Sequence, residues 1–352
     1  MIDVIDTEDG FNRLKDEWEI LQKNPKMRIF QTYDWCRSAW DYYVSKESGA
    51  RLWILRWHQE GKNDVVIFPF FIDGHGCLRF IMDTHSDLCD AVYDDKPVNR
   101  HWVFKEAAEA IESNKNILSV FLQKMGGTSL ALNHLSILLP GSIVNKDNAY
   151  SWVTSDKTDS FIAGQVHLRN SDRHRLKAIS RRSSGLNLEI LTNNLESFPM
   201  ETIKRLRRGM VGWRRENESF IPDKLIDFIG RIYSLGHCEI PVLRNKDNGE
   251  IKALAFRLLK ENYIIFWIVL YDNSHLPTEL GLKYMEAKSS KNACVFDYGV
   301  GAYDYKLGTY RPNIGITFSL RYSRNLFRLL KGLFSANIRL GKDLLKPRLK
   351  KK

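Results

Sequence analysis

The chain has 352 residues, of which 43% are hydrophobic and 12% aromatic, with a net charge of +11. This apolar content can bury sizeable cores and excludes an intrinsically disordered chain. Single cores rarely grow beyond roughly 250–300 residues, so we expect more than one lobe. The positive charge is concentrated in residues 165–216 and 324–352, so it bears on partners rather than on the fold.

Helical and strand-like patterns alternate in the N-terminal half. Thr7 is placed to cap a helix whose apolar residues recur at helical spacing from Phe11 to Leu21. A second helix is expected around Trp35 to Tyr43, and a third around His101 to Ile111. The expected strands, in chain order, are 2–5, 51–57, 65–72, 78–82 and 117–122. This interleaving is typical of an α/β fold.

The C-terminal half shows the same interleaving. Helices are expected within 157–184 and near 200–216, 222–235 and 278–289. The expected strands are 186–191, 240–243, 251–259, 263–270, 294–298 and 316–322. We therefore expect an α/β (α+β) fold with mixed sheets flanked by helices. The lobes would be residues 1–156 and 157–322, followed by a basic amphipathic tail at 323–352.

A possible anion site follows the strand that ends near Leu270. The N–H groups in the first turn of a helix lack intrahelical partners, and the helix dipole adds partial positive charge there. Pro277 and Thr278 suit a turn and a helix start, and Gly281 would let a ligand approach the first turn. An ordinary strand–loop–helix connection, with Gly281 as a packing residue, explains the same pattern. Because no P-loop or GxGxxG motif is present, both interpretations stay open.

Acids, tyrosines, glycines and a lysine are concentrated in FDYGVGAYDYKLGTY, just past a predicted strand. Asp297 and Tyr298 would lie at the C-terminal end of that strand, where α/β proteins often place active-site groups. Lys306 could neutralise an anionic ligand, and Tyr305 could donate a proton or stack on a ligand. A structural turn with aromatic core packing is the alternative.

Several segments together resemble a known family. They are FQTYDWCRSAW and IFPFF in the N-terminal half, RHRLKAISRRSSGL near the middle, and FDYGVGAYDYKLGTYRPN near the end. Over roughly residues 1–320 the chain resembles the CelD-like (cellulose-biosynthesis type) acetyltransferases. These are a branch of the GNAT superfamily related to the FemABX peptidoglycan aminoacyltransferases.

The resemblance implies two GNAT-like lobes, of which the N-terminal one is degenerate. The second lobe would bind acyl-CoA, in the first instance acetyl-CoA, as a co-substrate rather than a resident cofactor. The implied donor contacts are Val269, Leu270, Tyr271, Pro277, Thr278, Gly281 and Leu282. One departure is Glu279, which stands where the family often has small residues and would face an anionic pyrophosphate unless it points away.

The implied chemistry is acyl transfer from an already activated thioester. Asp297 or Asp304, directly or through water, would be the base, and Tyr298 or Tyr305 would protonate the leaving thiolate. A backbone N–H near Val269 or Leu270 would bind the carbonyl oxygen. The candidate catalytic residues are therefore Asp297, Asp304, Tyr298, Tyr305 and Lys306.

The resemblance also implies the acceptor, an amino sugar or another envelope-polysaccharide precursor. Two alternatives remain open. One is FemABX-like aminoacyl transfer from aminoacyl-tRNA, which the basic segment 165–216 would suit. The other is a non-catalytic membrane-surface scaffold for envelope biosynthesis. We expect no DNA partner and no metal; in DTHSDLCD, which contains His85, a polar loop is favoured over a metal site.

The N-terminus MIDVIDTEDGF has no basic and apolar leader pattern, and no apolar run reaches the roughly 18–20 residues of a membrane span. The five cysteines are scattered without a CxxC pair, which favours reduced thiols. We therefore expect a cytoplasmic protein. It could lie peripherally on the inner membrane face if the basic amphipathic helix within 324–352 binds anionic lipid, whereas a docked helix with a solvated tail is the alternative.

Overall fold

The computed structural model describes residues 1–61, 64–81, 83, 85–95, 99–156, 170–182, 185–214, 221–301 and 312–324. The chain divides into two compact units that each combine distant segments. Unit 1 contains Met1–Asn24, Tyr43–Asp147 and the described residues from Thr317 on, and unit 2 contains Pro25–Tyr42 and Asn148–Ile316. The units therefore differ from the predicted lobes mainly because Pro25–Tyr42 packs with the later half of the chain.

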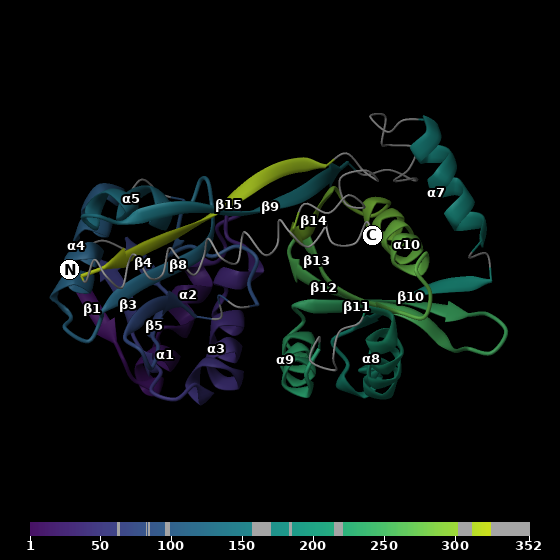
Figure 1. The fold of residues 1–352 in the computed structure, drawn as a ribbon, viewed down its shortest axis with the longest axis horizontal. Coiled ribbons are helices and arrows are strands. Elements are labelled where there is room, and N and C mark those ends of the chain that lie inside the picture. Colours follow the sequence, from purple (N-terminus) through teal and green to yellow (C-terminus); the bar gives the residue numbers. More distant parts are fainter. Residues whose placement is uncertain are drawn as a thin grey trace, which may run out of the picture. The chain divides into compact units, whose positions relative to one another are not determined.

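Unit 1 contains an antiparallel sheet with the strand order β1-β3-β4-β7 and a second group ordered β15-β8-β6-β5-β2 (Figure 1). The strands are β1 Ile2–Ile5, β2 Arg51–Leu52, β3 Ile54–His58, β4 Val65–Phe68, β5 Phe70–Ile72, β6 Cys77–Phe80, β7 Val92–Tyr93, β8 Ser119–Gly126 and β15 Asn313–Ser323. The first four residues of β15, up to Ile316, belong to unit 2. Its helices are α1 Glu8–Arg13, α2 Lys15–Leu21, α4 Arg100–Ser113 and α5 Leu130–Leu138. The predicted cap is confirmed, because the Thr7 hydroxyl accepts the Gly10 N–H at 3.1 Å.

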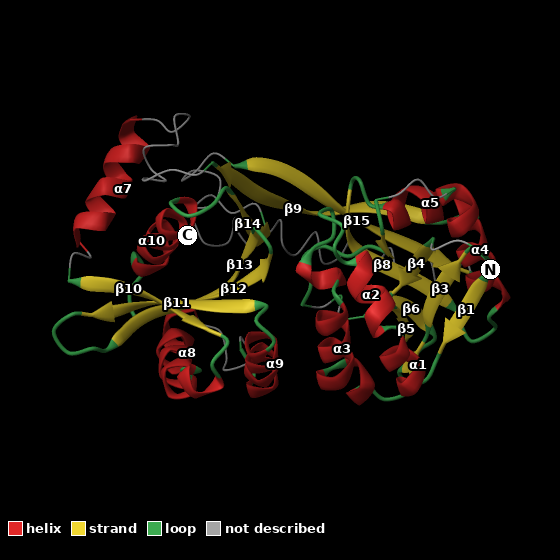
Figure 2. Cartoon of the chain, turned by 180° about the vertical axis from the view of Figure 1, so that it is seen from behind, coloured by secondary structure: helices red, strands yellow, loops and turns green. Residues whose placement is uncertain are grey.

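Unit 2 is built on strands in the order β10-β11-β12-β13-β14-β9, in which only β13 and β14 are parallel. The strands are β9 Ile143–Ser155, which belongs to unit 2 from Asn148 on, β10 Leu186–Thr192, β11 Cys238–Asn245, β12 Ile251–Lys260, β13 Tyr263–Tyr271 and β14 Cys294–Val300. The helices are α3 Tyr33–Tyr42, α7 Asn170–Arg182, α8 Met200–Arg214, α9 Asp223–Ser234 and α10 Leu276–Ser289, with a 3-10 turn η1 at Ile29–Gln31. Helices α8 and α9 cover one face of β10–β12 and α10 covers the other (Figure 2). The predicted mixed α/β class is confirmed.

Strand β9 was not predicted from the sequence. Polar residues such as Asn145, Asp147 and Asn148 interrupt its apolar pattern, and these residue types are poor strand formers. Pairing with β14, from Cys294↔Ser155 to Val300↔Tyr150, supports the strand instead. This omission matters because β9 brings two aromatic residues next to the candidate site.

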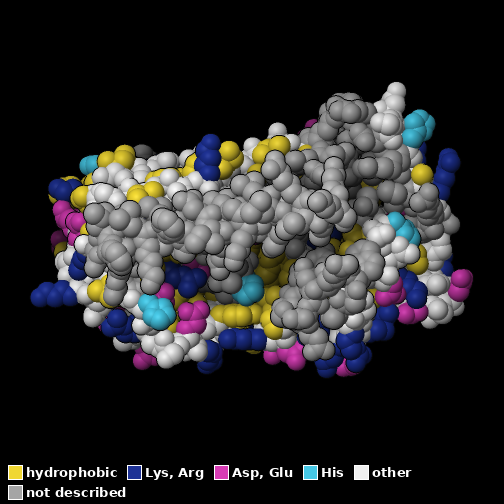
Figure 3. Space-filling model, viewed as in Figure 1, with side chains coloured by type: hydrophobic (Ala, Val, Ile, Leu, Met, Phe, Trp, Pro, Cys, Tyr) yellow, Lys and Arg dark blue, Asp and Glu magenta, His cyan; other side chains and the backbone are white. Residues whose placement is uncertain are grey.

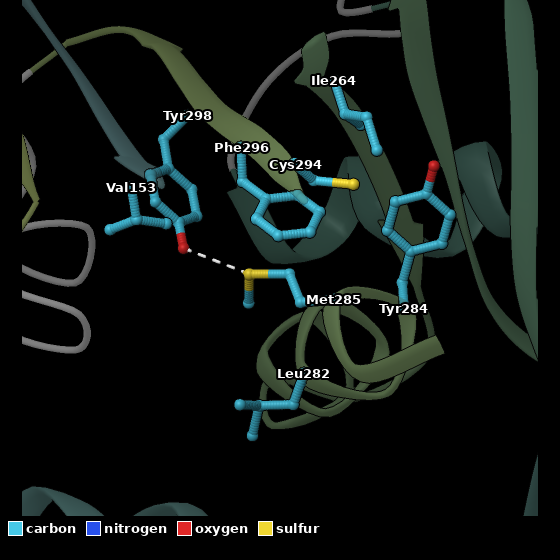
Figure 4. Close-up of a cluster of buried hydrophobic side chains, with 8 residues drawn as sticks. All are labelled: Val153, Ile264, Leu282, Tyr284, Met285, Cys294, Phe296 and Tyr298. Atoms are coloured by element: carbon cyan, nitrogen blue, oxygen red, sulfur yellow. Dashed lines mark hydrogen bonds between the residues drawn. The ribbon is translucent and has the colours of Figure 1, made fainter. Parts of the chain in front are cut away.

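One buried cluster fixes α10 against the strands of unit 2 (Figure 4). Its members are Val153, Ile264, Leu282, Tyr284, Met285, Cys294, Phe296 and Tyr298. A second cluster holds Leu276 and Leu280, at the start of α10, against Leu243, Ala253 and Ala255. Both ends of the helix are therefore held by apolar burial, which is the main stabilising force available to a helix of this length.

We predict that Leu282→Ala destabilises the protein by about 2–5 kcal/mol, because Leu282 is only 2% exposed and its removal leaves a cavity. Leu195→Ala is the matched control: Leu195 is 61% exposed, and its loss should change stability by less than about 0.5 kcal/mol. Urea unfolding of both variants measures the difference. Equal free energies of unfolding would contradict the packing described for α10.

Candidate active site

The parallel strands β13 and β14 run together for only three residue pairs and then part. The pairs are Tyr263↔Val295, Ile264↔Phe296 and Ile265↔Asp297. Strand β13 continues to Tyr271 and pairs with β12 over that length. Within the described ranges, the β13 edge that faces β14 therefore has no strand partner beyond Ile265, so its backbone groups can bind a ligand. We refer to this point of separation as the fork.

A β-bulge lies on β13 next to the fork. Phe256 pairs with Ile268 whereas Arg257 pairs with Phe266, so Trp267 is an extra residue. Bulges re-aim side chains and are frequent beside active sites. Here the Phe266 ring packs 5.2 Å from that of Tyr298 and the Trp267 ring 5.6 Å from that of Trp35, between centroids.

Asp297 occupies the last paired position of β14, at the fork itself. Its side chain is buried, and one carboxylate oxygen accepts the Gly299 N–H at 2.7 Å. The other oxygen accepts a hydrogen bond from the hydroxyl of Tyr263. The guanidinium of Arg28 lies over the Tyr263 ring, 3.9 Å from its centroid. The Gly299 N–H and the Tyr263 hydroxyl therefore orient the buried carboxylate of Asp297. The guanidinium of Arg28 in turn stacks on the Tyr263 ring.

The two tyrosines near Asp297 stay protonated. Burial raises the pKa of Tyr263, and the negative charge of Asp297 raises it further. Burial and Asp297 also raise the pKa of Tyr150. A neutral phenol donates a hydrogen bond but is a poor base, so Asp297 is the candidate proton acceptor of this group.

Asp297 and Tyr298, adjacent in sequence, are not brought together. Successive side chains of a strand point to opposite faces, and Tyr298 lies in the cluster under α10. Its hydroxyl donates to the Met285 sulfur at 3.4 Å (Figure 4). Asp304, Tyr305 and Lys306, the other predicted catalytic residues, lie outside the described residues.

The start of α10 presents fewer free amides than a regular helix start. The Leu276 N–H donates to the Asn273 carbonyl at 3.1 Å, and Pro277 has no N–H. The Glu279 N–H donates to the His275 carbonyl at 3.3 Å, which is the ordinary first bond of an α-helix. Within the described part of the chain, Thr278 alone among the first three helical residues keeps an amide without a recorded hydrogen bond. An anion at this helix start would therefore need additional donors.

The side chain of Glu279 points into the protein. It is 0% exposed, and its carboxylate lies 3.5 Å from the Lys283 amine. Lys283 in turn donates to the Leu186 carbonyl at 3.0 Å. A ligand at the surface of the helix start would therefore not meet the Glu279 carboxylate directly. Glu279 thus does not place a negative charge on the surface that an anionic ligand would contact.

The other residues predicted to contact the acyl donor lie around the start of α10, but their side chains differ in how far they are buried. Leu270 and Leu282 are buried in the core, so a ligand could reach them only through the backbone. Val269 and Tyr271 are partly buried against Leu276 and Leu280. A Cβ on Gly281 would lie 3.6 Å from the Phe266 ring, an ordinary packing distance. These positions agree with the packing alternative for Gly281.

The surroundings of the cysteines and of the acidic loop around His85 indicate structural roles. The five thiols are free, and burial raises the pKa of Cys294. Asp83 is ion-paired with Arg79 at 2.5 Å. Asp90 accepts the Leu130 and Ala131 N–H groups, each at 3.0 Å. No cluster of His, Cys, Asp or Glu among the described residues could hold a metal ion.

None of the helices in the described ranges is long and apolar enough to cross a bilayer. The basic segment proposed to bind lipid lies almost entirely outside those ranges, since only Arg324 is described.

The sequence interpretation missed Tyr263, Arg28 and Tyr150. Tyr263 is the first residue of the apolar run YIIFWIVLY. A polar group at the start of an otherwise apolar strand can indicate a site residue. No local pattern distinguishes Arg28, which reaches the site because Pro25–Tyr42 belongs to unit 2.

The architecture is a GNAT-type α/β fold. It is similar to FemX, at 11% sequence identity and a TM-score of 0.59, over 89% of this chain and 97% of that one. The L-PGS of Bacillus licheniformis gives 15% identity and a TM-score of 0.56 over 88% and 92%. The C-terminal domain of a putative lysylphosphatidylglycerol synthetase from Agrobacterium fabrum gives 13% and 0.55 over 86% and 95%.

At these identities the similarities establish the fold and leave the reaction to be argued from the site. No family model matches the sequence, and no curated protein matches it.

We predict that Tyr263→Phe destabilises the protein by about 1–3 kcal/mol, because it leaves the buried Asp297 carboxylate without one of its donors. Tyr298→Phe is the control, since its hydroxyl donates to a methionine sulfur, a weak acceptor. Urea unfolding at pH 7 should show the larger loss for Tyr263→Phe. A larger loss for Tyr298→Phe would mean that the Tyr263–Asp297 hydrogen bond contributes little.

Proposed function

We propose that the chain is an acyltransferase that moves an acyl group from acyl-CoA, in the first instance acetyl-CoA, to an amine or hydroxyl group. The acceptor proposed from the family resemblance is an amino sugar or another envelope-polysaccharide precursor. The observation that carries the proposal is the fork, where β13 and β14 part with the buried carboxylate of Asp297 at the last paired position.

The fork supplies the two groups that thioester aminolysis or alcoholysis needs. Backbone N–H groups on the unpaired edge of β13 just beyond Ile265 can donate to the carbonyl oxygen as negative charge develops there. Val269 and Leu270, the positions expected for this role, lie roughly 13–17 Å further along the strand than the level of Asp297. Asp297 can accept the proton of the attacking amine or hydroxyl. A new bond forms from the nucleophile to the carbonyl carbon, the carbon–sulfur bond breaks, and the leaving thiolate takes up a proton.

Tyr263 then has a positioning role. Its raised pKa keeps the phenol protonated, so it holds the carboxylate of Asp297 in one orientation without competing for the substrate proton. Arg28 lies over the Tyr263 ring, and this cation–π contact helps to fix the phenol that holds Asp297.

Aminoacyl transfer from a tRNA-borne donor is the second candidate, and one observation favours it. The start of α10 has few free amides, which weakens it as a pyrophosphate site. Basic residues are exposed on two other helices of unit 2, with Lys177 and Arg181 on α7 and Arg208 on α8. Figure 3 shows Lys and Arg side chains gathered in the region of α8. Such charge suits a polyanionic donor.

Thermal unfolding with each donor separates the candidates. We predict that acetyl-CoA raises the Tm, because a ligand at about a hundred times its Kd stabilises the folded state by about 2.7 kcal/mol. A shift with tRNA and none with acetyl-CoA would favour aminoacyl transfer. If neither raises the Tm, the non-catalytic scaffold is favoured and the transferase proposal fails.

We further predict that Asp297→Asn lowers kcat for acyl transfer by about 10²- to 10⁴-fold, the usual contribution of a general base. The donor-induced Tm shift should remain, because Asp297 is not assigned to donor binding. Asp227→Asn, an exposed aspartate of α9, is the matched control and should keep full activity. Full activity of Asp297→Asn would remove the assignment of Asp297 as the base.

A further inference from the structure

Asp297 lies between aromatic residues of two neighbouring strands. On one side is Tyr263 of β13, which donates to it. On the other side Trp152 of β9 pairs directly with Asp297, so both side chains point to the same face. Tyr150, two residues before Trp152, points to that face as well. These rings surround the proposed base on the face opposite to the cluster under α10.

Tyr150 and Trp152 form a stacked pair. Their ring centroids are 5.3 Å apart and their planes differ by 21°. Both side chains are partly exposed, whereas most large aromatic residues of the core are fully buried. A stacked, partly exposed aromatic pair beside a carboxylate offers an apolar surface and a hydrogen-bond acceptor within one small area.

The position of the Tyr150 ring depends on Gly315 of β15. A Cβ at residue 315 would lie 2.3 Å from two carbons of the Tyr150 ring and 2.6 Å from its hydroxyl oxygen. Contacts this short cannot exist, so any larger residue would force the ring to move. The φ of Gly315 is not in the left-handed region, so the backbone itself would accept alanine. The methyl group is therefore the only perturbation that this substitution adds.

A structural explanation also exists for this arrangement. An aromatic residue over a cross-strand glycine covers exposed backbone and supports strand pairing. That role predicts an effect on stability alone. It does not account for the position of the stacked pair next to Asp297 at the fork.

Resting on the proposed transferase function, we propose that Trp152 and Tyr150 form an aromatic platform that binds the ring of a sugar acceptor beside Asp297. Gly315 is then a positioning residue that leaves room for the platform. One face of a pyranose ring carries mainly C–H groups and packs on an aromatic ring as other apolar surfaces do. A hydroxyl or amine on the ring edge would then lie next to the Asp297 carboxylate.

Saturation-transfer NMR with methyl N-acetyl-β-glucosaminide as the probe tests the platform in the full chain. We expect the wild type to bind, and Trp152→Leu and Gly315→Ala to weaken binding by roughly 2- to 10-fold, the range of one aromatic contact. Gly209→Ala is the matched control, because a Cβ there would meet nothing within 4 Å. It should bind as the wild type does.

Two results would overturn the platform: no probe binding by the wild type, or unchanged affinity in both Trp152→Leu and Gly315→Ala. If Gly315→Ala does not fold, as judged by urea unfolding, Trp152→Leu decides. The Tm shift with acetyl-CoA is measured on the same samples. A retained shift without sugar binding refutes only the platform, whereas a missing shift with sugar binding refutes the proposed donor and leaves the platform in place.

Discussion

The candidate site depends on the short parallel pairing between β13 and β14. Three residue pairs align Ile265 with Asp297, and then the strands part. This register places the carboxylate at the fork and brings the Tyr263 hydroxyl to it from two residues away on the neighbouring strand. A shift of one residue would turn Asp297 to the face of α10, where Phe296 and Tyr298 now pack. The chemistry therefore rests on strand register more than on any single side chain.

The packing of α10 limits how its first turn can bind a ligand. Leu276 and Leu280 are buried against β11 and β12, and Glu279 is buried beside Lys283. Apolar burial thus determines the course of the helix start, and its amides are partly used by the chain itself. A donor would have to obtain much of its binding energy from the unpaired edge of β13. The proposed acyl transfer therefore depends on the fork more than on a donor site at the start of α10.

Local patterns predicted most elements near the site. The strands 251–259 and 263–270, the helix near 278–289 and the strand 294–298 correspond to β12, β13, α10 and β14. Asp297 was predicted at the C-terminal end of its strand, but β14 continues to Val300, and Asp297 lies where the pairing with β13 ends. Strand alternation, however, separates Asp297 from Tyr298, which the motif had suggested as partners. Arg28 and Tyr150 could not be predicted, because only the tertiary fold brings them to residues 263 and 297.

Chain order is therefore a poor guide to the unit that carries the site. Pro25–Tyr42 belongs to unit 2, where Trp35 packs on Phe228 with ring centroids 5.0 Å apart. Asp34 of the same segment pairs with His237 at 2.8 Å. These contacts hold the segment that carries Arg28 onto Tyr263. A protein cut at the predicted lobe boundary would keep Asp297 with its donors Tyr263 and Gly299. It would lose both Arg28 and the β9 aromatic pair, so the C-terminal half alone would lack the cation over Tyr263 and the proposed platform.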